Sequence, residues 1–191
     1  MTAAAALLRT ARRSRGLSQS RLATDARDHQ PTVSALERGD HDPGVAHLAR
    51  LLAATGHRLV VLPTTSRPVC EAATDIESAL RAGDEPAAFR EAIQLSDDLG
   101  REHGVIRVAL TATAPPTVGD VRYDALIAAI AEHYLLAERL PKPRWLASKV
   151  VLAEPWFVDE LAATREAALA TTPPSFARRG VIIAASELAS V

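Results

Sequence analysis

Apolar side chains in the first third of the chain recur at intervals of three and four residues, in stretches separated by glycines or polar turns. This spacing places them on one face of a helix. Ser18 is suited to cap such a helix at its N-terminus, and Gly39 is suited to end one. The pattern therefore predicts four short helices, over residues 4–14, 19–24, 30–38 and 44–55.

A run of branched apolar residues follows the fourth helix and is too short to form another one. Leu59, Val60, Val61 and Leu62 therefore predict a strand. Because an isolated strand cannot satisfy its backbone hydrogen bonds, it must pair with the rest of the chain or with a second copy. Residues 63–68 contain two prolines and no large apolar residue, which is typical of a linker.

Residues 68–191 show helical patterns of their own. The strongest predicts a helix over residues 121–140, with Leu126, Ile127 and Ile130 facing inward. The other predicted elements are a helix that is capped at Thr74 or Asp75, a helix over residues 85–99, and a segment over residues 105–113 that fits either a strand or a helix. We expect this part of the chain to be mostly helical.

Charge divides the chain at the same place. Residues 1–67 contain ten Arg and five Asp or Glu, a net charge of +5, whereas residues 68–191 contain ten Arg, two Lys and eighteen Asp or Glu, a net charge of −6. The overall charge of −1 thus conceals a difference of eleven charges, which indicates two modules with different partners. We predict a basic domain over residues 1–67 and an acidic partner- or ligand-binding domain over residues 68–191.

Composition excludes several classes of protein. The single cysteine, Cys70, rules out a disulfide framework and a thiolate zinc site. No apolar run approaches the roughly 18 residues that would span a bilayer. The first arginines follow the N-terminal apolar stretch, whereas a secretory signal places positive charge first. We therefore expect a cytoplasmic protein without a membrane partner.

The sequence contains no recognisable catalytic or metal-binding motif. Glu132 and His133 lack the second histidine of a metalloprotease helix, and the histidine spacings match no zinc pattern. A glycine-rich phosphate loop and a serine-nucleophile elbow are also missing. We expect no catalytic residues, no metal and no cofactor.

Residues Leu8–Gly56 resemble the Xre/Cro-type helix-turn-helix domain of bacterial and phage repressors. The spaced elements that carry the resemblance are Arg9, Arg12, Gly16-Leu17-Ser18-Gln19, Leu22-Ala23, Val33-Ser34, Glu37-Arg38-Gly39, Pro43, Leu48, Leu51 and Gly56. Agreement of several spaced elements is more specific than one short motif. Together with the helical patterns of residues 68–191, the resemblance predicts a mainly α fold class, with a helix-turn-helix bundle, a short dimerisation strand and a mostly helical C-terminal domain.

By this resemblance, residues 30–38 form a recognition helix that enters the major groove of duplex DNA. Gln30 can then read adenine with both ends of its amide, and Gln19 is expected to hold a phosphate at the N-terminus of the second helix. The further DNA contacts that the resemblance implies are Arg13, Arg15, Thr32, Ser34, Ala35 and Arg38.

Several positions bear on the structure of this domain. Arg12 and Glu37 stand where many family members form an ion pair between the first and third helices, which makes Arg12 structural. Arg27 replaces the usual turn glycine, and because arginine at positive φ is costly, a different turn conformation is an alternative here. Asp28 replaces a usual apolar residue, and His29 replaces a usual Ser or Thr cap.

Domains of this type usually dimerise, and antitoxin-like members often do so through a strand at the position of residues 59–62. The resemblance therefore implies a homodimer that binds a palindrome-like operator. Its two recognition helices would lie about one DNA turn, roughly 34 Å, apart.

Aromatic residues of the acidic domain gather near its middle. Trp145, Trp156 and Phe157 are a candidate partner surface, since aromatic residues are favoured interface hot spots. The alternative is that Trp145 and Trp156 fill a small core between alanine-rich helices, and the scarcity of large apolar residues favours it.

A second resemblance concerns the C-terminal region. Its Pro-x-Pro-x-Trp turn, Glu-Pro-Trp-Phe box and Phe-x-Arg-Arg-Gly-Val ending look like parts of some actinobacterial Xre-type regulators, several of which resemble antitoxins paired with nucleotidyltransferase-like toxins. We therefore predict a dimeric, operator-binding repressor that acts as an autoregulating type II antitoxin and binds a toxin through its acidic domain. The alternatives are a transcription factor that senses a small molecule and an enzyme with a helix-turn-helix appendage.

Overall fold

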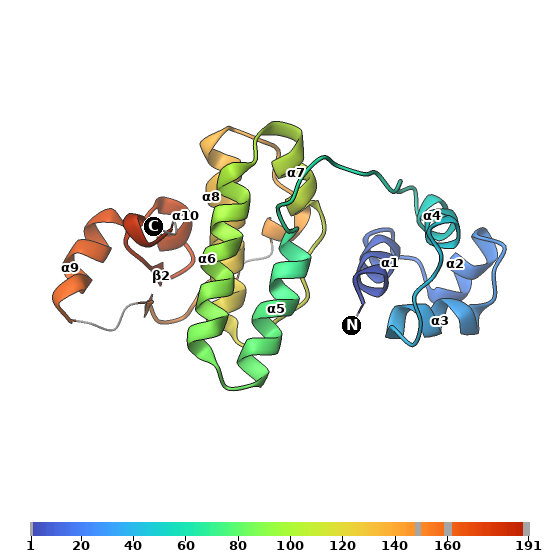
Figure 1. Cartoon of the computed structure of the whole chain (residues 1–191), viewed down its shortest axis with the longest axis horizontal. Helices are drawn as coiled ribbons and strands as arrows, with labels where there is room; N and C mark the ends of the chain where they lie inside the picture. The colour runs from blue at the N-terminus through green and yellow to red at the C-terminus, as the bar shows by residue number, and fades with distance from the viewer. Residues whose placement is uncertain (1, 148–149, 159–161, 189–191) are drawn as a thin grey trace. The chain divides into compact units, whose positions relative to one another are not determined.

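The structure is a computed structural model that describes residues 2–147, 150–158 and 162–188 (Figure 1). The described chain is mainly helical, which confirms the predicted fold class. It forms two compact units, Met1–Pro63 and Thr64–Val191. The boundary lies at the first residue of the segment that was expected to be a linker.

Residues 2–63 fold into four short helices whose ends lie within one residue of the predicted ones. They are α1 Ala3–Ser14, α2 Gln19–Asp25, α3 Gln30–Arg38 and α4 Val45–Ala54 (Figure 1). The Ser18 hydroxyl caps α2, and Gly39 ends α3 with a φ of 82°, as the sequence predicted. The core consists of apolar residues from all four helices, among them Leu8, Leu22, Val33, Leu36 and Leu51.

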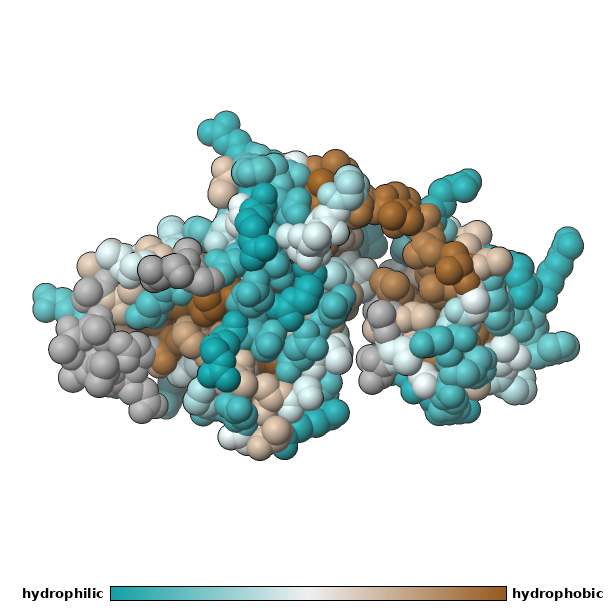
Figure 2. Space-filling model, viewed as in Figure 1, coloured by the Kyte–Doolittle hydropathy of each residue, from teal (hydrophilic) through white to brown (hydrophobic). Residues whose placement is uncertain are grey.

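The segment after α4 is extended and exposed, and the strand predicted over residues 59–62 is absent from the single chain. A strand needs a ladder of backbone hydrogen bonds, and the described residues provide no partner strand for this segment. Val60 is 68% exposed and Val61 is 94% exposed. Figure 2 shows the resulting apolar surface, in brown, where this segment runs.

Residues 64–68, which were expected to be a linker, belong to the folded C-terminal unit. The hydroxyl groups of Thr64 and Ser66 both donate hydrogen bonds to Glu102 Oε1. The guanidinium group of Arg67 forms ion pairs with three carboxylates, those of Asp75, Glu91 and Asp98. Their local composition predicted a linker, whereas tertiary contacts bind them to residues 75–102 of the C-terminal unit.

The C-terminal unit is built around one long, largely buried helix, α8 Val121–Ala137. Helices α5 Val69–Arg81, α6 Glu85–Arg101 and α7 Gly104–Ala112 contact it. Its apolar face includes Leu126, Ile127 and Ile130, which are all buried as predicted.

The structure settles one open prediction in this unit, at α7, and corrects another, at the start of α5. Residues 105–113, which fitted either a strand or a helix, lie almost entirely in helix α7. Helix α5 begins at Val69 with Pro68 as its N-cap, so the predicted caps Thr74 and Asp75 lie inside the helix. The helix extends toward the N-terminus because Val69 is buried in the core.

The last part of the described chain consists of short elements. A parallel pair of two-residue strands, β1 Trp156–Phe157 and β2 Val181–Ile182, joins distant segments. The remaining elements are η1 Arg144–Ala147, α9 Ala162–Thr171, α10 Pro174–Ala177 and η2 Ala185–Leu188. None of the helices in the described residues is both long and apolar enough to span a membrane.

Candidate nucleic-acid interface

Helix α3 has one buried face and one accessible face. Val33, Leu36 and Glu37 are buried against the rest of the N-terminal unit. Gln30 and Arg38 are exposed. The other three predicted DNA contacts of this helix, Thr32, Ser34 and Ala35, are half-buried.

A chain of polar contacts runs from the interior of this unit to Gln30. Arg12 donates two hydrogen bonds to the carboxylate of Glu37, from Nε to Oε1 over 2.6 Å and from Nη2 to Oε2 over 2.8 Å. Gln19 Nε2 donates to Glu37 Oε2 over 3.0 Å. Gln30 Nε2 then donates to Gln19 Oε1 over 3.3 Å. The buried ion pair thereby positions the first side chain of α3.

This chain constrains the orientation of the Gln30 amide. Because Gln19 directs its nitrogen at Glu37, its oxygen is left to face Gln30 and attracts the Gln30 nitrogen. The Gln30 oxygen and one N–H have no hydrogen-bond partner among the residues that the structure describes, and that acceptor–donor pair complements the edge of adenine in the major groove. Gln19 therefore has a positioning role beside the phosphate contact expected for it.

The ion pair expected between Arg12 and Glu37 is present, and it is nearly buried, with 12% and 2% of the two side chains exposed. Burial alone would raise the pKa of Glu37, but hydrogen bonds from Arg12 and Gln19 and the charges of Arg12 and Arg9 lower it overall. The Glu37 hydrogen bond and charge raise the pKa of Arg12 despite its burial. Arg12 also donates to the Leu17 carbonyl over 2.6 Å, so its guanidinium is occupied within the fold.

The turn between α2 and α3 keeps a left-handed residue, although that residue is arginine. Arg27 has a φ of 54°. The backbone N–H of Arg27 donates to the Thr24 carbonyl and that of Asp28 to the Ala23 carbonyl, which is the Schellman pattern that usually ends in glycine. The alternative of a different turn conformation is therefore wrong. Arg50 donates to the carbonyls of Ala26 and Arg27 and holds this turn in place.

Sequence reasoning missed a polar cluster beneath the same turn. The Asp28 carboxylate is hydrogen-bonded to His47 and lies 3.3 Å from Arg50, both on α4. Burial would raise the pKa of Asp28, but the His29 N–H, His47 and Arg50 together lower it. The available signal was the replacement of an apolar residue by Asp28, combined with His47 and Arg50 at i and i+3 of one helix.

The basic side chains proposed as phosphate contacts fall into two groups. Arg13 and Arg15 are exposed, and no carboxylate among the described residues pairs with either of them. Arg38 instead donates to Ser34 Oγ and forms an ion pair with Asp40 at 2.7 Å. Exposed pairs of this kind contribute little to stability, so Arg38 can exchange Asp40 for a phosphate.

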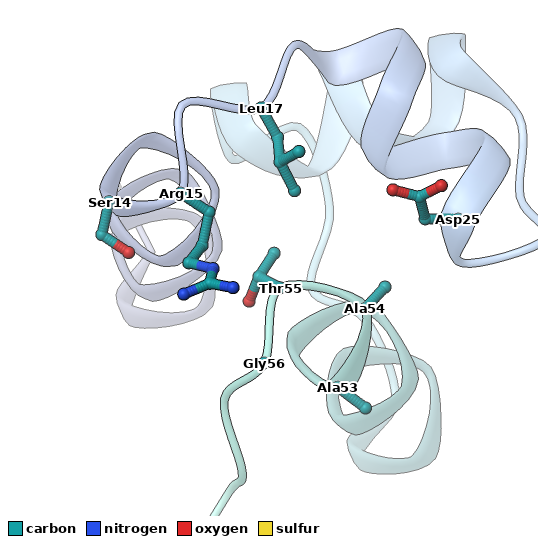
Figure 3. A pocket seen from close by; sticks show the side chains of 8 residues that line it. All are labelled: Ser14, Arg15, Leu17, Asp25, Ala53, Ala54, Thr55 and Gly56. Carbon is teal, nitrogen blue, oxygen red and sulfur yellow. The ribbon is translucent and has the colours of Figure 1, made fainter.

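An open pocket of about 570 Å³ lies within the N-terminal unit, at the C-terminal ends of α1 and α4 (Figure 3). Arg15, Leu17, Asp25 and Thr55 are among its lining residues, and none of the lining residues comes from α3. Figure 3 shows the Arg15 guanidinium directed toward Thr55. The structure therefore places Arg15 beside α4 and does not bring it into the Gln19–Gln30 chain.

The candidate aromatic surface of the C-terminal unit is partly used by its own core. Trp145 donates its indole N–H to the Thr111 carbonyl over 2.8 Å and packs against the core. Trp156 packs against the same core, with its ring 5.4 Å from that of Tyr123. Phe157 is half-buried in β1. These contacts support the core-filling alternative for the two tryptophans.

The described part of the chain contains no group of three or more His, Cys, Asp or Glu side chains that could hold a metal ion. Burial raises the pKa of the Cys70 thiol, which disfavours the nucleophilic thiolate. The geometry thus directs attention to the accessible face of α3.

Comparison with known proteins agrees with this geometry. Residues 8–60 match the sequence model of a helix-turn-helix family, the Xre/Cro type. The match spans α1 to α4 and continues into the extended segment, and it indicates a DNA-binding transcription regulator. Comparisons with curated proteins and with solved structures gave no match.

Proposed function

We propose that this protein is a sequence-specific repressor that inserts α3 into the major groove of an operator. The observation that carries the proposal is the chain from Arg12 through Glu37 and Gln19 to Gln30. It holds a side chain suited to reading adenine at the exposed N-terminus of α3. The net charge of +4 over residues 1–63, from nine Arg and five Asp or Glu, adds attraction to phosphates that does not depend on DNA sequence.

The repressor acts as a homodimer in this proposal. Residues 59–62 are extended and apolar, Leu59, Val60 and Val61 among them are exposed, and the segment directly follows the helix-turn-helix unit. Pairing of this segment with the same segment of a second copy would satisfy its backbone and cover its valines. The dimer would present two copies of α3 to half-sites about 34 Å apart.

The finer part of the proposal is that the acidic unit binds and neutralises a basic toxin, as in a type II antitoxin. Helices α5 and α6 together carry seven Asp or Glu and three Arg, and with Arg67, which pairs with three of these carboxylates, the net charge is −3. Such a surface is repelled by DNA and attracts a positively charged protein. The resemblance of the C-terminal region adds a nucleotidyltransferase-like toxin as the expected partner class.

The DNA-binding part is tested by selecting duplexes that the full-length protein retains from a random pool. We expect enrichment of one palindrome-like sequence with adenine at a fixed position of each half-site. Affinity for this sequence should fall steeply with salt, because each phosphate contact releases counterions. Retention of duplexes without sequence preference would contradict the proposal.

The antitoxin part needs a separate experiment, namely co-purification of the full-length protein from its native host. We expect one basic protein to be recovered in stoichiometric amount, encoded by an adjacent gene and toxic when it is expressed alone. Recovery of no such protein, together with a small molecule that alters operator affinity, would instead support the ligand-sensing alternative.

A further inference from the structure

Basic residues of the acidic C-terminal unit are concentrated in two segments. Residues 139–153 and 167–186 contain six of the thirteen Lys and Arg of this unit and none of its eighteen Asp and Glu. The rest of the unit therefore has seven cations and eighteen acids. Such segregation creates a local positive potential within a unit whose net charge is negative.

The fold brings the two segments together at one carboxylate of α8. Glu132 Oε1 lies 3.1 Å from Lys142 Nζ and 3.6 Å from Arg178 Nη2. Glu132 Oε2 lies 3.0 Å from Arg179 Nη2. Three cations thus surround one anion, and among the described residues no second carboxylate forms an ion pair with them, so that two positive charges are left uncompensated there.

The buried half of this cluster is structural, whereas the other half is accessible. The side chains of Glu132 and Arg179 are 10% and 6% exposed, so they form the buried pair. Lys142 is 46% exposed and Arg178 is 57% exposed. Because both approach the same Glu132 oxygen, their nitrogens are close enough for a single tetrahedral oxyanion to contact both.

Lys142 is also presented on a constrained backbone. It lies between Pro141 and Pro143, whose rings fix their φ angles. Trp145, three residues later, is anchored to the Thr111 carbonyl and to the core. A rigid support of this kind lowers the entropy lost when a ligand binds.

We propose that Lys142 and Arg178 form a binding site for the phosphate group of a small ligand, such as a diphosphate or a nucleotide. Two uncompensated cations match the double negative charge of a phosphate group. A small ligand senses only the charges within about a Debye length of 8–10 Å. A long polyanion such as nucleic acid would in addition meet the surplus acids of the same unit, which disfavours it.

The test is isothermal titration calorimetry, in which sodium pyrophosphate is added to the full-length protein at constant ionic strength. Parallel titration with ATP distinguishes a free diphosphate from a nucleotide as the preferred ligand. We expect saturable binding at one site per chain. Lys142→Ala and Arg178→Ala should each weaken it about tenfold or more, since each removes a charge-assisted hydrogen bond.

Arg81→Ala is the matched control, because Arg81 is an exposed arginine of the same unit that pairs only with Glu77 among the described residues. It should leave pyrophosphate affinity unchanged, and Lys142→Arg should retain binding. The proposal is overturned if pyrophosphate does not saturate the protein, or if Arg81→Ala weakens binding as much as Lys142→Ala. It is also overturned if Lys142→Ala and Arg178→Ala reduce affinity for duplex DNA and not for pyrophosphate.

Discussion

Gln19 donates a hydrogen bond of 3.0 Å to the buried carboxylate of Glu37, so the start of α2 is tied to the C-terminal end of α3. The side-chain oxygen of Gln19 also accepts a hydrogen bond from Gln30 at the start of α3. One side chain therefore connects the ion pair that stabilises the fold with the group proposed to read DNA. Changes at these positions should separate stability from specificity.

Gln30→Ala should reduce discrimination at one base of the operator by about 1–3 kcal/mol, because it removes a two-ended contact with that base. Gln19→Ala should relax preference at the same base by a smaller amount, about 0.5–1.5 kcal/mol, because the Gln30 amide loses its support. Binding to a panel of operators substituted at single positions measures both effects. Equal weakening of all sequences by Gln30→Ala would show that Gln30 does not read a base.

Arg12→Ala should destabilise the N-terminal unit by about 3–5 kcal/mol, since it leaves the buried carboxylate of Glu37 without its cation. All seven aromatic residues lie in the C-terminal unit, so tryptophan fluorescence follows only that unit. Denaturation monitored by far-UV circular dichroism should therefore show the lower stability of the N-terminal unit. The midpoint of the transition monitored by tryptophan fluorescence should not change. Arg21→Ala, which breaks an exposed pair with Asp25, should have little effect. Unchanged unfolding of Arg12→Ala would contradict the structural role of the pair.

Arg27→Gly should stabilise the N-terminal unit by about 0.5–1 kcal/mol. Glycine adopts the observed φ of 54° without the steric cost that arginine bears, although the flexibility that it adds to the unfolded chain offsets part of the gain. Arg139 ends α8 with a φ of 55°, so Arg139→Gly should stabilise the C-terminal unit in the same way. Thermal unfolding of both variants measures these effects. A lower melting temperature for Arg27→Gly would mean that the arginine side chain makes a stabilising contact.

The N-terminal unit should lose stability in acid because of Asp28 and Glu37. Both pKa values are lowered in the folded protein, so the unfolded state takes up protons first as pH falls. Their contribution is complete above about pH 5 and disappears as pH drops below about 4, through the lowered folded-state pKa values. Hydrogen exchange of α1–α3 amides between pH 3 and 7 would record this loss. The slope should be shallower in Glu37→Gln, and an identical slope would contradict the assignment.

Val61→Lys should impair dimerisation, because it places a charge at the most exposed apolar position of the extended segment. Burial of a valine contributes about 1.5–3 kcal/mol, so the dimer dissociation constant should rise at least about tenfold. Sedimentation velocity measures the change. Val105→Lys, at an exposed valine of α7, is the matched control and should leave the dimer intact. A wild-type protein that remains monomeric at high concentration would overturn the proposed dimer.

Local patterns in the sequence were sufficient to predict the helices of the N-terminal unit. Val33 and Leu36 stand at i and i+3 of one helix, as Leu48 and Leu51 do of another, and the structure buries all four. Ser18 indicated a helix start because its hydroxyl accepts a hydrogen bond from a backbone N–H of the first turn. Gly39 indicated a helix end because glycine adopts the left-handed conformation without steric cost. The same local reasoning missed the start of α5 at Val69, since burial against other helices decided that boundary.

Position along the chain also determined the division of charge between the two halves and the pairing of Arg12 with Glu37 expected from the resemblance. For the other polar groups that meet over long separations, only the tertiary structure showed the partners. The Asp28–His47 contact, the binding of Arg67 by three carboxylates and the convergence of Lys142 and Arg178 on Glu132 all join residues from different elements. Periodicity reports which side of an element is apolar, but the partner of a charged side chain depends on how elements pack, which no local pattern encodes.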